Sequence, residues 1–207
     1  MPLPRFERLP DDRREAILKA AAIEFGSAGF EGASFNRIIE RAGLSKGAMY
    51  YYFADKEDLY RTVVATSTAR IMEVVGRPQL VTTAEGFWNE CRAMYGRVLR
   101  FLFEEREAAR LCFRLARGGK THPAEREAYE VVRELVDGLA RFGQRLGAVR
   151  DDVPVELLVE MAFGAMEGMD VWLGQRWESA EEADLELFAG WWIDALRRLA
   201  APMEALR

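Results

Sequence analysis

Apolar side chains that recur with the 3.6-residue period of an α-helix are the feature that most constrains the fold of this chain. Long stretches of the 207 residues show this period, and none sustains the alternation of apolar and polar residues that a half-buried β-strand requires. Proline lies near the ends of these stretches, where it does not interrupt a helix. We therefore predict an all-α protein.

The composition is that of a folded, soluble protein. Apolar residues make up 50% of the chain and charged residues 30%, which is too much apolar material for a disordered chain. The first residues do not resemble a signal peptide, and no apolar run reaches the roughly 18 residues that a membrane span needs. We expect a cytoplasmic protein with no membrane partner.

Cysteine and histidine are too scarce for a structural metal site. The chain has two cysteines, Cys91 and Cys112, and one histidine, His122. A structural zinc site needs about four such ligands at set spacings. We predict no metal and no cofactor, and we interpret the cysteines as buried free thiols, with a redox switch as the alternative.

Capping residues divide the first 60 residues into short helices. A helix is predicted over 11–29, a second after the N-cap Ser34 and ending at Gly43, a third after Ser45, and a longer one after Asp55. The longer helices that follow are predicted near 55–76, 83–105, 107–118, 124–147, 154–176 and 181–201.

The segment 34–53 has the spacing of a helix-turn-helix. Two short helices meet at Gly43, and the apolar Leu44 is placed to pin one helix against the other. In this motif the second helix enters the DNA major groove with its N-terminal residues. The net charge of the chain is −5, but residues 34–53 have three basic side chains against one acidic side chain. Their local charge is therefore +2 (Arg37, Arg41 and Lys46 against Glu40).

The second helix of this motif has residues suited to DNA. Lys46 can reach a phosphate or a guanine edge, while Gly47 and Ala48 are small enough to let the backbone approach the duplex. Three consecutive tyrosines cannot all face one core, so we expect Tyr51 to point outward toward the sugar-phosphate backbone. Tyr50 and Phe53, in line with Met49, are expected to pack in the core of the small bundle.

The first 60 residues resemble the signature of the TetR family of transcriptional regulators. The resemblance rests on these spaced positions: Ile17-x-x-Ala20-Ala21-x-x-x-Phe25, Gly29-Phe30, Ile38, Ala42-Gly43-Leu44-Ser45-Lys46-Gly47, Tyr50-x-x-Phe53 and Lys56-Glu57-x-Leu59.

Position by position, the resemblance implies a DNA-binding surface. Two departures limit it: Glu24 stands where leucine is common and is expected to face solvent, and Phe35 replaces a common serine or threonine, which removes a phosphate contact. The implied DNA contacts are Ser34, Asn36, Ser45, Lys46, Gly47, Ala48, Tyr50, Tyr51 and Lys56.

The resemblance also implies two domains, a helix-turn-helix domain over 1–54 and an effector-binding and dimerisation domain over 55–207. One copy of the first domain is too small for specific affinity, so we expect a homodimer on a near-palindromic double-stranded operator. Family members pair their last two helices between subunits, although the same apolar stripes can instead fill the core of one chain. The predicted dimerisation residues are Met161, Ala165, Gly168, Trp172, Phe188, Trp191, Trp192 and Leu196.

In the family, the middle helices enclose a pocket for a small-molecule effector. Such pockets are mostly apolar, and methionine suits an adaptable wall, although aromatic stripes at helical spacing are more often core than pocket. The predicted effector-binding residues are Trp88, Cys91, Tyr95, Phe113, Met166 and Met169.

The sequence favours a one-component repressor that its effector releases from the operator. An activator, or a regulator that needs its ligand to bind DNA, remains as an alternative, as does a helical interaction module that has lost DNA binding. No nucleophile elbow, phosphate-binding loop, dinucleotide fingerprint or metal-ligand cluster occurs, so we do not expect an enzyme.

Overall fold

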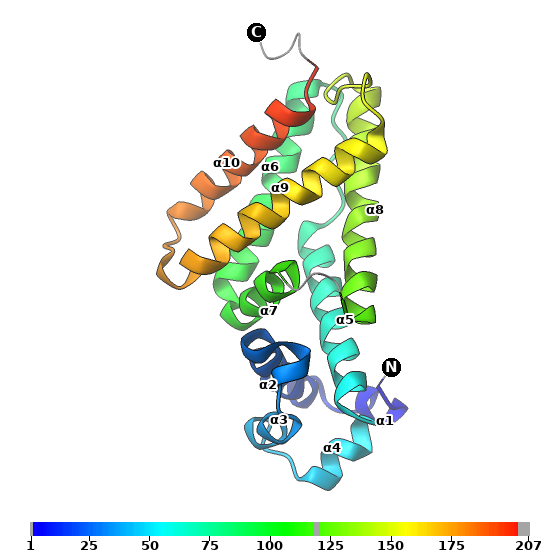
Figure 1. Ribbon diagram of the computed structural model, residues 1–207, viewed down its shortest axis with the longest axis vertical. Helices are drawn as coiled ribbons and strands as arrows, with labels where there is room; N and C mark the ends of the chain where they lie inside the picture. Colours follow the sequence, from blue (N-terminus) through cyan, green and yellow to red (C-terminus); the bar gives the residue numbers. More distant parts are fainter. Residues whose placement is uncertain (1, 118–120, 203–207) are drawn as a thin grey trace. The chain divides into compact units, whose positions relative to one another are not determined.

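The computed structural model describes residues 2–117 and 121–202, and these ranges contain helices and no strands (Figure 1). The prediction of an all-α protein is confirmed. The helices are α1 (Pro4–Glu7), α2 (Asp11–Gly32), α3 (Phe35–Arg41), α4 (Lys46–Tyr52), α5 (Lys56–Val75), α6 (Ala84–Glu104), α7 (Arg106–Arg117), α8 (Pro123–Arg145), α9 (Val155–Arg176), the short 3₁₀-helix η1 (Trp177–Ser179) and α10 (Asp184–Ala200).

The predicted helix bounds lie close to the observed ones. Among the helices after residue 55, the largest difference is at the start of the last one, predicted at residue 181 and observed at Asp184. Residue 118, the predicted end of the helix observed as α7, lies outside the described residues. Helix α2 passes the predicted stop at Gly29, where the backbone turns with a φ of 70°, and ends at Gly32. The four-residue α1 was not predicted.

The chain divides into two compact units. The head unit contains the described residues of 1–70 and 105–128, and the bundle unit contains those of 71–104 and 129–207. Helix α7 therefore packs with the N-terminal helices, although it follows α6 in the chain. The functional boundary expected at residue 54 is a different division, and it stays a prediction.

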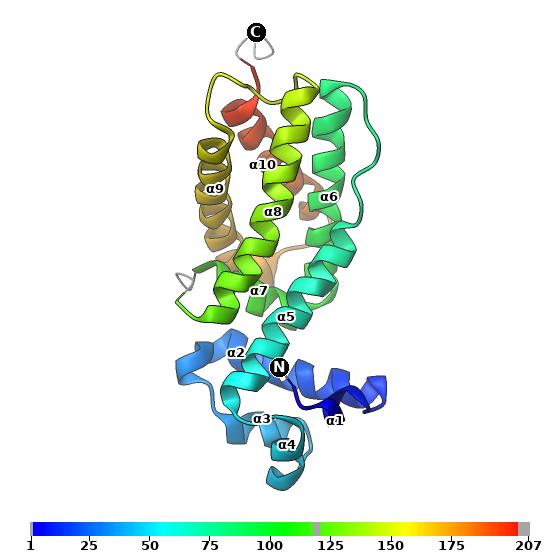
Figure 2. The same cartoon turned by 90° about the vertical axis from the view of Figure 1, so that its right-hand side faces the viewer.

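Within the head unit, α2 packs most closely on α7. The approach needs a small residue on α2, because a Cβ atom at Gly26 would lie 3.1 Å from the backbone nitrogen of Leu111. A larger side chain there would push the two helices apart. Figure 2 shows α2, α3, α4 and the first turns of α5 gathered together in this unit.

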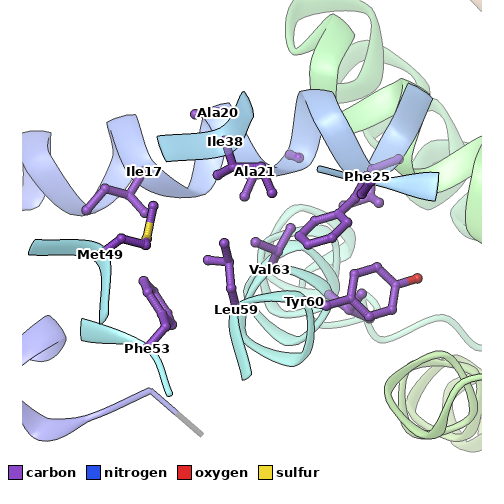
Figure 3. Packing of buried hydrophobic residues seen from close by; sticks show 14 of the residues in the cluster. Ile17, Ala20, Ala21, Phe25, Ile38, Met49, Phe53, Leu59, Tyr60 and Val63 are labelled. Carbon is purple, nitrogen blue, oxygen red and sulfur yellow. The ribbon is translucent and has the colours of Figure 1, made fainter. Parts of the chain in front are cut away.

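The core of the head unit draws buried side chains from several helices, most of them from α2 and α5 (Figure 3). Ile17 and Phe25 come from α2, Ile38 from α3, Met49 from α4 and Leu59 from α5, and all five are at most 2% exposed. Because α3 and α4 are far too short to be stable alone, burial of these side chains holds them in the folded protein.

The bundle unit is built on α10, which packs against α6 and α9. Its core joins Trp88 of α6, Leu158 of α9, and Trp192 and Ile193 of α10. The helix η1 is anchored in the same unit, since the Trp177 indole N–H donates a hydrogen bond to the backbone oxygen of Leu102 at 3.3 Å. The bundle unit is thus held mainly by apolar packing along long helices.

Candidate nucleic-acid interface

A serine side chain caps the N-terminus of each helix of the predicted helix-turn-helix. The Ser34 hydroxyl accepts a hydrogen bond from the backbone N–H of Arg37 at 3.3 Å, and the Ser45 hydroxyl accepts one from Ala48 at 3.1 Å. Each serine satisfies a backbone donor that the first helical turn leaves unpaired. Both predicted N-caps are confirmed.

The turn between α3 and α4 has the geometry of a Schellman motif. Gly43 has a φ of 66°, a conformation that side chains with a Cβ disfavour. Its N–H donates to the Glu40 carbonyl at 3.1 Å, and the N–H of Leu44 donates to the Ile39 carbonyl at 3.1 Å. Leu44 then packs against the core of the head unit, as predicted, and fixes where the second helix begins.

Helix α4 has one buried side and one open side. Met49 on the helix and Phe53 at its C-cap have no exposed surface, so they fix the rotation of the helix. Lys46 and Gly47 are exposed at its N-terminal end. No atom lies within 4 Å of the place that a Cβ atom of residue 47 would take, so packing in this chain does not require glycine there.

The two tyrosines in the middle of α4 are both exposed, Tyr50 by 46% and Tyr51 by 51%. Tyr51 was expected to point outward, but the expectation that Tyr50 packs in the core is wrong. Tyr50 lies on the surface with its ring 5.4 Å from that of Phe35. The prediction aligned Tyr50 with Phe53, yet Phe53 is extended (φ −131°) and has left the helix, so the helical spacing no longer applies.

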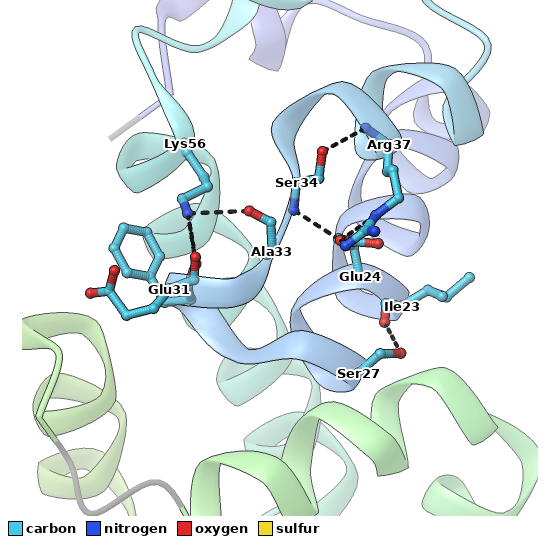
Figure 4. A network of polar contacts seen from close by, with 9 residues as sticks. Ile23, Glu24, Ser27, Glu31, Ala33, Ser34, Arg37 and Lys56 are labelled. Atoms are coloured by element: carbon cyan, nitrogen blue, oxygen red, sulfur yellow. Dashed lines mark hydrogen bonds and ion pairs between the residues drawn. The ribbon is translucent and has the colours of Figure 1, made fainter.

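The expectation that Glu24 faces solvent is also wrong. Its carboxylate is buried between α2 and α3, and one oxygen accepts hydrogen bonds from the Ser34 backbone N–H at 2.9 Å and from the Arg37 guanidinium at 2.9 and 2.6 Å (Figure 4). Burial alone would raise the pKa of Glu24, but these hydrogen bonds and the positive charge of Arg37 outweigh it and lower the pKa. The carboxylate thus ties α2 to the N-terminus of α3.

Lys56 is bound within the head unit. Its ammonium group donates to the backbone oxygens of Phe30 at 2.8 Å, Ala33 at 3.2 Å and Glu31 at 3.3 Å, and it lies 4.7 Å from the centre of the Phe30 ring. Figure 4 shows the amine turned toward the end of α2. These bonds satisfy carbonyls that the last turn of α2 leaves unpaired. The structure therefore gives Lys56 a capping role that the sequence did not indicate.

The structure brings the predicted DNA contacts together along α3, the turn, α4 and the start of α5. None of them is buried. The exposed residues are Asn36, Ser45, Lys46, Gly47, Tyr50 and Tyr51, and the partly buried ones are Ser34, Ala48 and Lys56.

The predicted effector-binding residues do not all lie together. Trp88, Cys91, Tyr95, Met166 and Met169 belong to one apolar cluster of the bundle unit, whereas Phe113 is buried on α7 in the head unit. Burial, and then the charge of Glu90, raises the pKa of the Cys91 thiol to about 12. A thiol that stays protonated at neutral pH is a poor nucleophile, which disfavours a redox switch at this cysteine.

The sequence prediction missed one ionisable group in the same unit. Asp170 lies on α9 one turn after Met166, so the two side chains share a face of the helix. Its side chain keeps some solvent access, yet burial, and then the charge of Glu167, raises the pKa of its carboxyl to about 7. An aspartate at a core-facing helix position was the available signal.

The predicted dimerisation residues of α9 and α10 divide into exposed and buried sets. The rings of Trp172, Phe188 and Trp191 lie within 6.2 Å of one another on the two helices. Leu157 and Leu187 are further exposed apolar residues on these helices that were not predicted. The exposed set is Met161, Ala165, Gly168 and Trp191, the partly buried set is Trp172 and Leu196, and the buried set is Phe188 and Trp192.

Neither a metal site nor a membrane span occurs in residues 2–117 and 121–202. Among them, no group of three or more histidine, cysteine, aspartate or glutamate side chains is arranged to hold a metal ion. In the same part of the chain, every helix is too short or too polar to cross a membrane.

The N-terminal sequence matches a known family. The model of the family described as "Bacterial regulatory proteins, tetR family" matches residues 17–63. The HTH-type transcriptional repressor AcnR of Corynebacterium diphtheriae is 33% identical over 158 residues, which cover 70% of this chain and 73% of AcnR. AcnR of Corynebacterium glutamicum is 28% identical over 77% of this chain and 80% of its own length.

Solved structures share the fold of this chain. The fatty acid degradation regulator FadR of Bacillus halodurans aligns with a TM-score of 0.73 at 16% identity, over 91% of this chain and 96% of FadR. FadR of Bacillus subtilis, solved in complex with stearoyl-CoA, aligns with a TM-score of 0.68 at 18% identity, over 88% of this chain and 96% of that protein.

Proposed function

This chain belongs to the TetR family of bacterial regulatory proteins and is a DNA-binding transcription regulator, and from this premise we propose that it is a cytoplasmic repressor released from its operator by a small-molecule effector. The observation that carries the proposal is the open face of α4. Lys46, Gly47 and Tyr51 are exposed on a helix that Met49 and Phe53 anchor from behind.

This face suits the major groove of a duplex. The exposed N-terminal end of α4 provides Lys46 for a phosphate or a guanine edge, and Ala48 for the methyl group of a thymine. At Gly47 the absence of a side chain serves no neighbour inside the chain, which supports close approach by DNA as its role. Ser34, Asn36, Ser45, Tyr50 and Tyr51 surround this end and complete the proposed surface.

The regulator acts as a homodimer on a near-palindromic operator. Leu157 and Met161 on α9 and Leu187 and Trp191 on α10 are 41–54% exposed, which is a costly arrangement for large apolar side chains in a monomer. We assign these four residues, with Ala165 and Gly168, to the dimer interface. Two heads joined in this way can bind half-sites about 34–36 Å apart.

The effector binds in the bundle unit, among Trp88, Cys91, Tyr95, Met166 and Met169. This cluster is apolar, and four of the five side chains are only partly buried. The raised pKa of Asp170, on the same face of α9 as Met166, marks a carboxyl without a compensating cation. Ligand sites combine an apolar wall with a few such polar groups, so we expect an apolar effector with a polar group that faces Asp170.

Release from DNA requires the effector to favour one arrangement of the two heads. Helix α5 runs without a break from the head unit into the bundle unit, so it supplies residues to both. An effector that prefers one position of this helix changes the spacing of the recognition helices. A coupling free energy of about 1–3 kcal/mol changes operator affinity roughly 5- to 150-fold.

The proposal is tested on a duplex that the wild-type protein selects from a random-sequence DNA library. Gly47→Ala should keep or raise the free energy of unfolding, because alanine favours the helix, yet lower DNA affinity at least about fivefold. The Lys46→Ala/Tyr51→Ala double variant should lose affinity and also show a shallower dependence of affinity on salt.

Titration of the fluorescently labelled duplex at several salt concentrations gives the DNA affinity of each variant and the dependence of that affinity on salt. The matched control is Gly138→Ala on α8, where a new Cβ atom also meets nothing within 4 Å and which should leave DNA binding unchanged. Failure of the wild type to enrich any duplex at low salt, or an unchanged affinity in the Lys46→Ala/Tyr51→Ala variant, would contradict the assigned surface.

A further inference from the structure

The short helix α1 is built onto the recognition helix. The backbone N–H of Leu3 donates to the Tyr52 carbonyl at 3.0 Å, and the Phe6 side chain is only 4% exposed. The Phe6 ring centre lies 4.7 Å from that of Phe53 and 6.5 Å from that of Tyr52. Residues 3–6 therefore have a fixed place at the C-terminal end of α4.

This packing places two arginines beside the proposed DNA surface. The guanidinium of Arg5 lies 4.3 Å above the centre of the Tyr51 ring, and both Arg5 and Arg8 are exposed. Together with Leu3 and Pro4, the two arginines border one shallow hollow. No carboxylate pairs with either arginine among the described residues, whereas the nearby Arg14 is paired with Asp11.

We propose that Arg5 and Arg8 bind backbone phosphates of the duplex that α4 recognises, so that α1 extends the recognition surface. The inference rests on the proposed function. A recognition helix reads bases with its N-terminal residues, whereas α1 is seated at the opposite end of α4, beside Tyr51 and Tyr52. That position faces the sugar-phosphate backbone next to the bases that are read.

Arginine suits this role better than lysine does. Its planar guanidinium presents a fork of donors that matches the phosphate oxygens, and it stacks on an aromatic ring without losing those donors. The Tyr51 ring holds the Arg5 guanidinium in place before DNA arrives, and Phe6 holds the helix that carries it. Tyr51 therefore both contacts DNA and positions Arg5.

The test measures affinity for the selected duplex against salt concentration, with an unrelated duplex of the same length beside it. Arg5→Gln and Arg8→Gln should each lower affinity roughly 3- to 10-fold at low salt, on both duplexes alike. Each should also reduce the slope of log affinity against log salt by about 0.9, the value for one lost phosphate contact. The matched control is Arg77→Gln, an exposed arginine between α5 and α6, which should change neither quantity.

Double variants test the contact between Arg5 and Tyr51. Tyr51→Phe keeps the ring, so Arg5→Gln should have its full effect in that background. Tyr51→Ala removes the ring, so the effect of Arg5→Gln should there fall to about half or less on a logarithmic scale. An equal effect in both backgrounds overturns the positioning role of the ring.

The outcomes separate this inference from the proposed function. If Arg5→Gln and Arg8→Gln leave affinity and salt slope unchanged while Lys46→Ala weakens binding, α1 does not bind phosphate and the regulator proposal stands. If Arg5→Gln changes the preferred sequence without changing the salt slope, Arg5 contacts bases and the phosphate assignment is wrong. If Lys46→Ala also has no effect, the surface itself is misassigned. Thermal unfolding of each variant shows that its fold is retained.

Discussion

The two short helices of the recognition motif in the head unit and the last two helices of the bundle unit begin in different ways. In the head, α3 and α4 have seven residues each, and both begin at a serine whose hydroxyl caps the first turn. In the bundle, α9 and α10 have 22 and 17 residues and begin without a side-chain cap. For the short helices the caps add to the few buried side chains that hold them in place, whereas the long helices have burial along a whole face.

A buried or partly buried carboxyl group in each unit shows the same contrast. Glu24 in the head accepts three hydrogen bonds, and its pKa is lowered. Asp170 in the bundle has Glu167 as its charged neighbour, and its pKa is raised to about 7. One carboxylate therefore stabilises the fold when it is ionised, and the other opposes it. In the proposed function the head unit presents a fixed surface and the bundle unit responds to a ligand, and the two carboxyl groups match these roles.

The largest expected effect comes from Asp170. Because its pKa is higher in the folded protein than in the unfolded chain, the free energy of unfolding falls as the pH rises from about 4 through about 7. Asp170→Asn removes this loss. The free energy of unfolding of the variant minus that of the wild type should therefore be about 2–3 kcal/mol larger at pH 8 than at pH 5. Urea denaturation at one fixed protein concentration measures the difference.

A gap between wild type and variant that does not change with pH would show that Asp170 is solvated like an ordinary aspartate. The control is Asp194→Asn on α10, which replaces an exposed aspartate. The difference in free energy of unfolding between this variant and the wild type should be the same at pH 5 and pH 8. A pH-independent gap between wild type and Asp170→Asn would also remove Asp170 from the proposed effector site.

Glu24 should show a pH dependence of the opposite sign. Its pKa is lower in the folded protein, so its contribution is present above its ordinary pKa of 4.5 and is lost as the pH falls through the lowered value. Glu24→Gln should cost about 1–2 kcal/mol at pH 7, less than a fully buried ion pair because Arg37 is exposed to water.

The difference between Glu24→Gln and the wild type should shrink in acid, as followed by chemical denaturation from pH 7 down to pH 3. Glu40→Gln, an exposed glutamate of α3, serves as the control and should cost little at any pH. A Glu24→Gln variant as stable as the wild type at pH 7 would mean that packing, not the carboxylate, joins α2 to α3.

The same contrast explains what the sequence could predict. The caps Ser34 and Ser45 and the turn at Gly43 follow from rules that involve three or four neighbouring residues, and all three are confirmed. The role of Glu24 depends on partners 10 and 13 residues away, at and beyond the start of α3, so its departure from the leucine common in the family was wrongly interpreted as exposure to solvent.

For related reasons, the sequence did not predict helix α1 or the neighbours that cover each face of the bundle helices. Helix α1 has four residues, too few to show a period, and its only local signal is proline in its first turn. In the bundle unit, periodicity predicted the bounds of α9 and α10 but not which neighbour covers each face. Trp192 was expected at a dimer interface, and it lies instead in the apolar cluster of its own chain. Apolar stripes of the same kind serve a core, a pocket or a partner.

The smallest expected effect distinguishes two roles for Lys56. The resemblance implies a phosphate contact, whereas the structure shows its ammonium group on three carbonyls at the C-terminal end and C-cap of α2. Lys56→Met keeps the apolar stem over Phe30 and removes the donors. It should cost about 1 kcal/mol of stability, because carbonyls at the end of α2 lose their partner, and leave the salt dependence of DNA binding unchanged. A salt slope reduced by about 0.9 would show that Lys56 leaves these carbonyls for a phosphate when DNA binds.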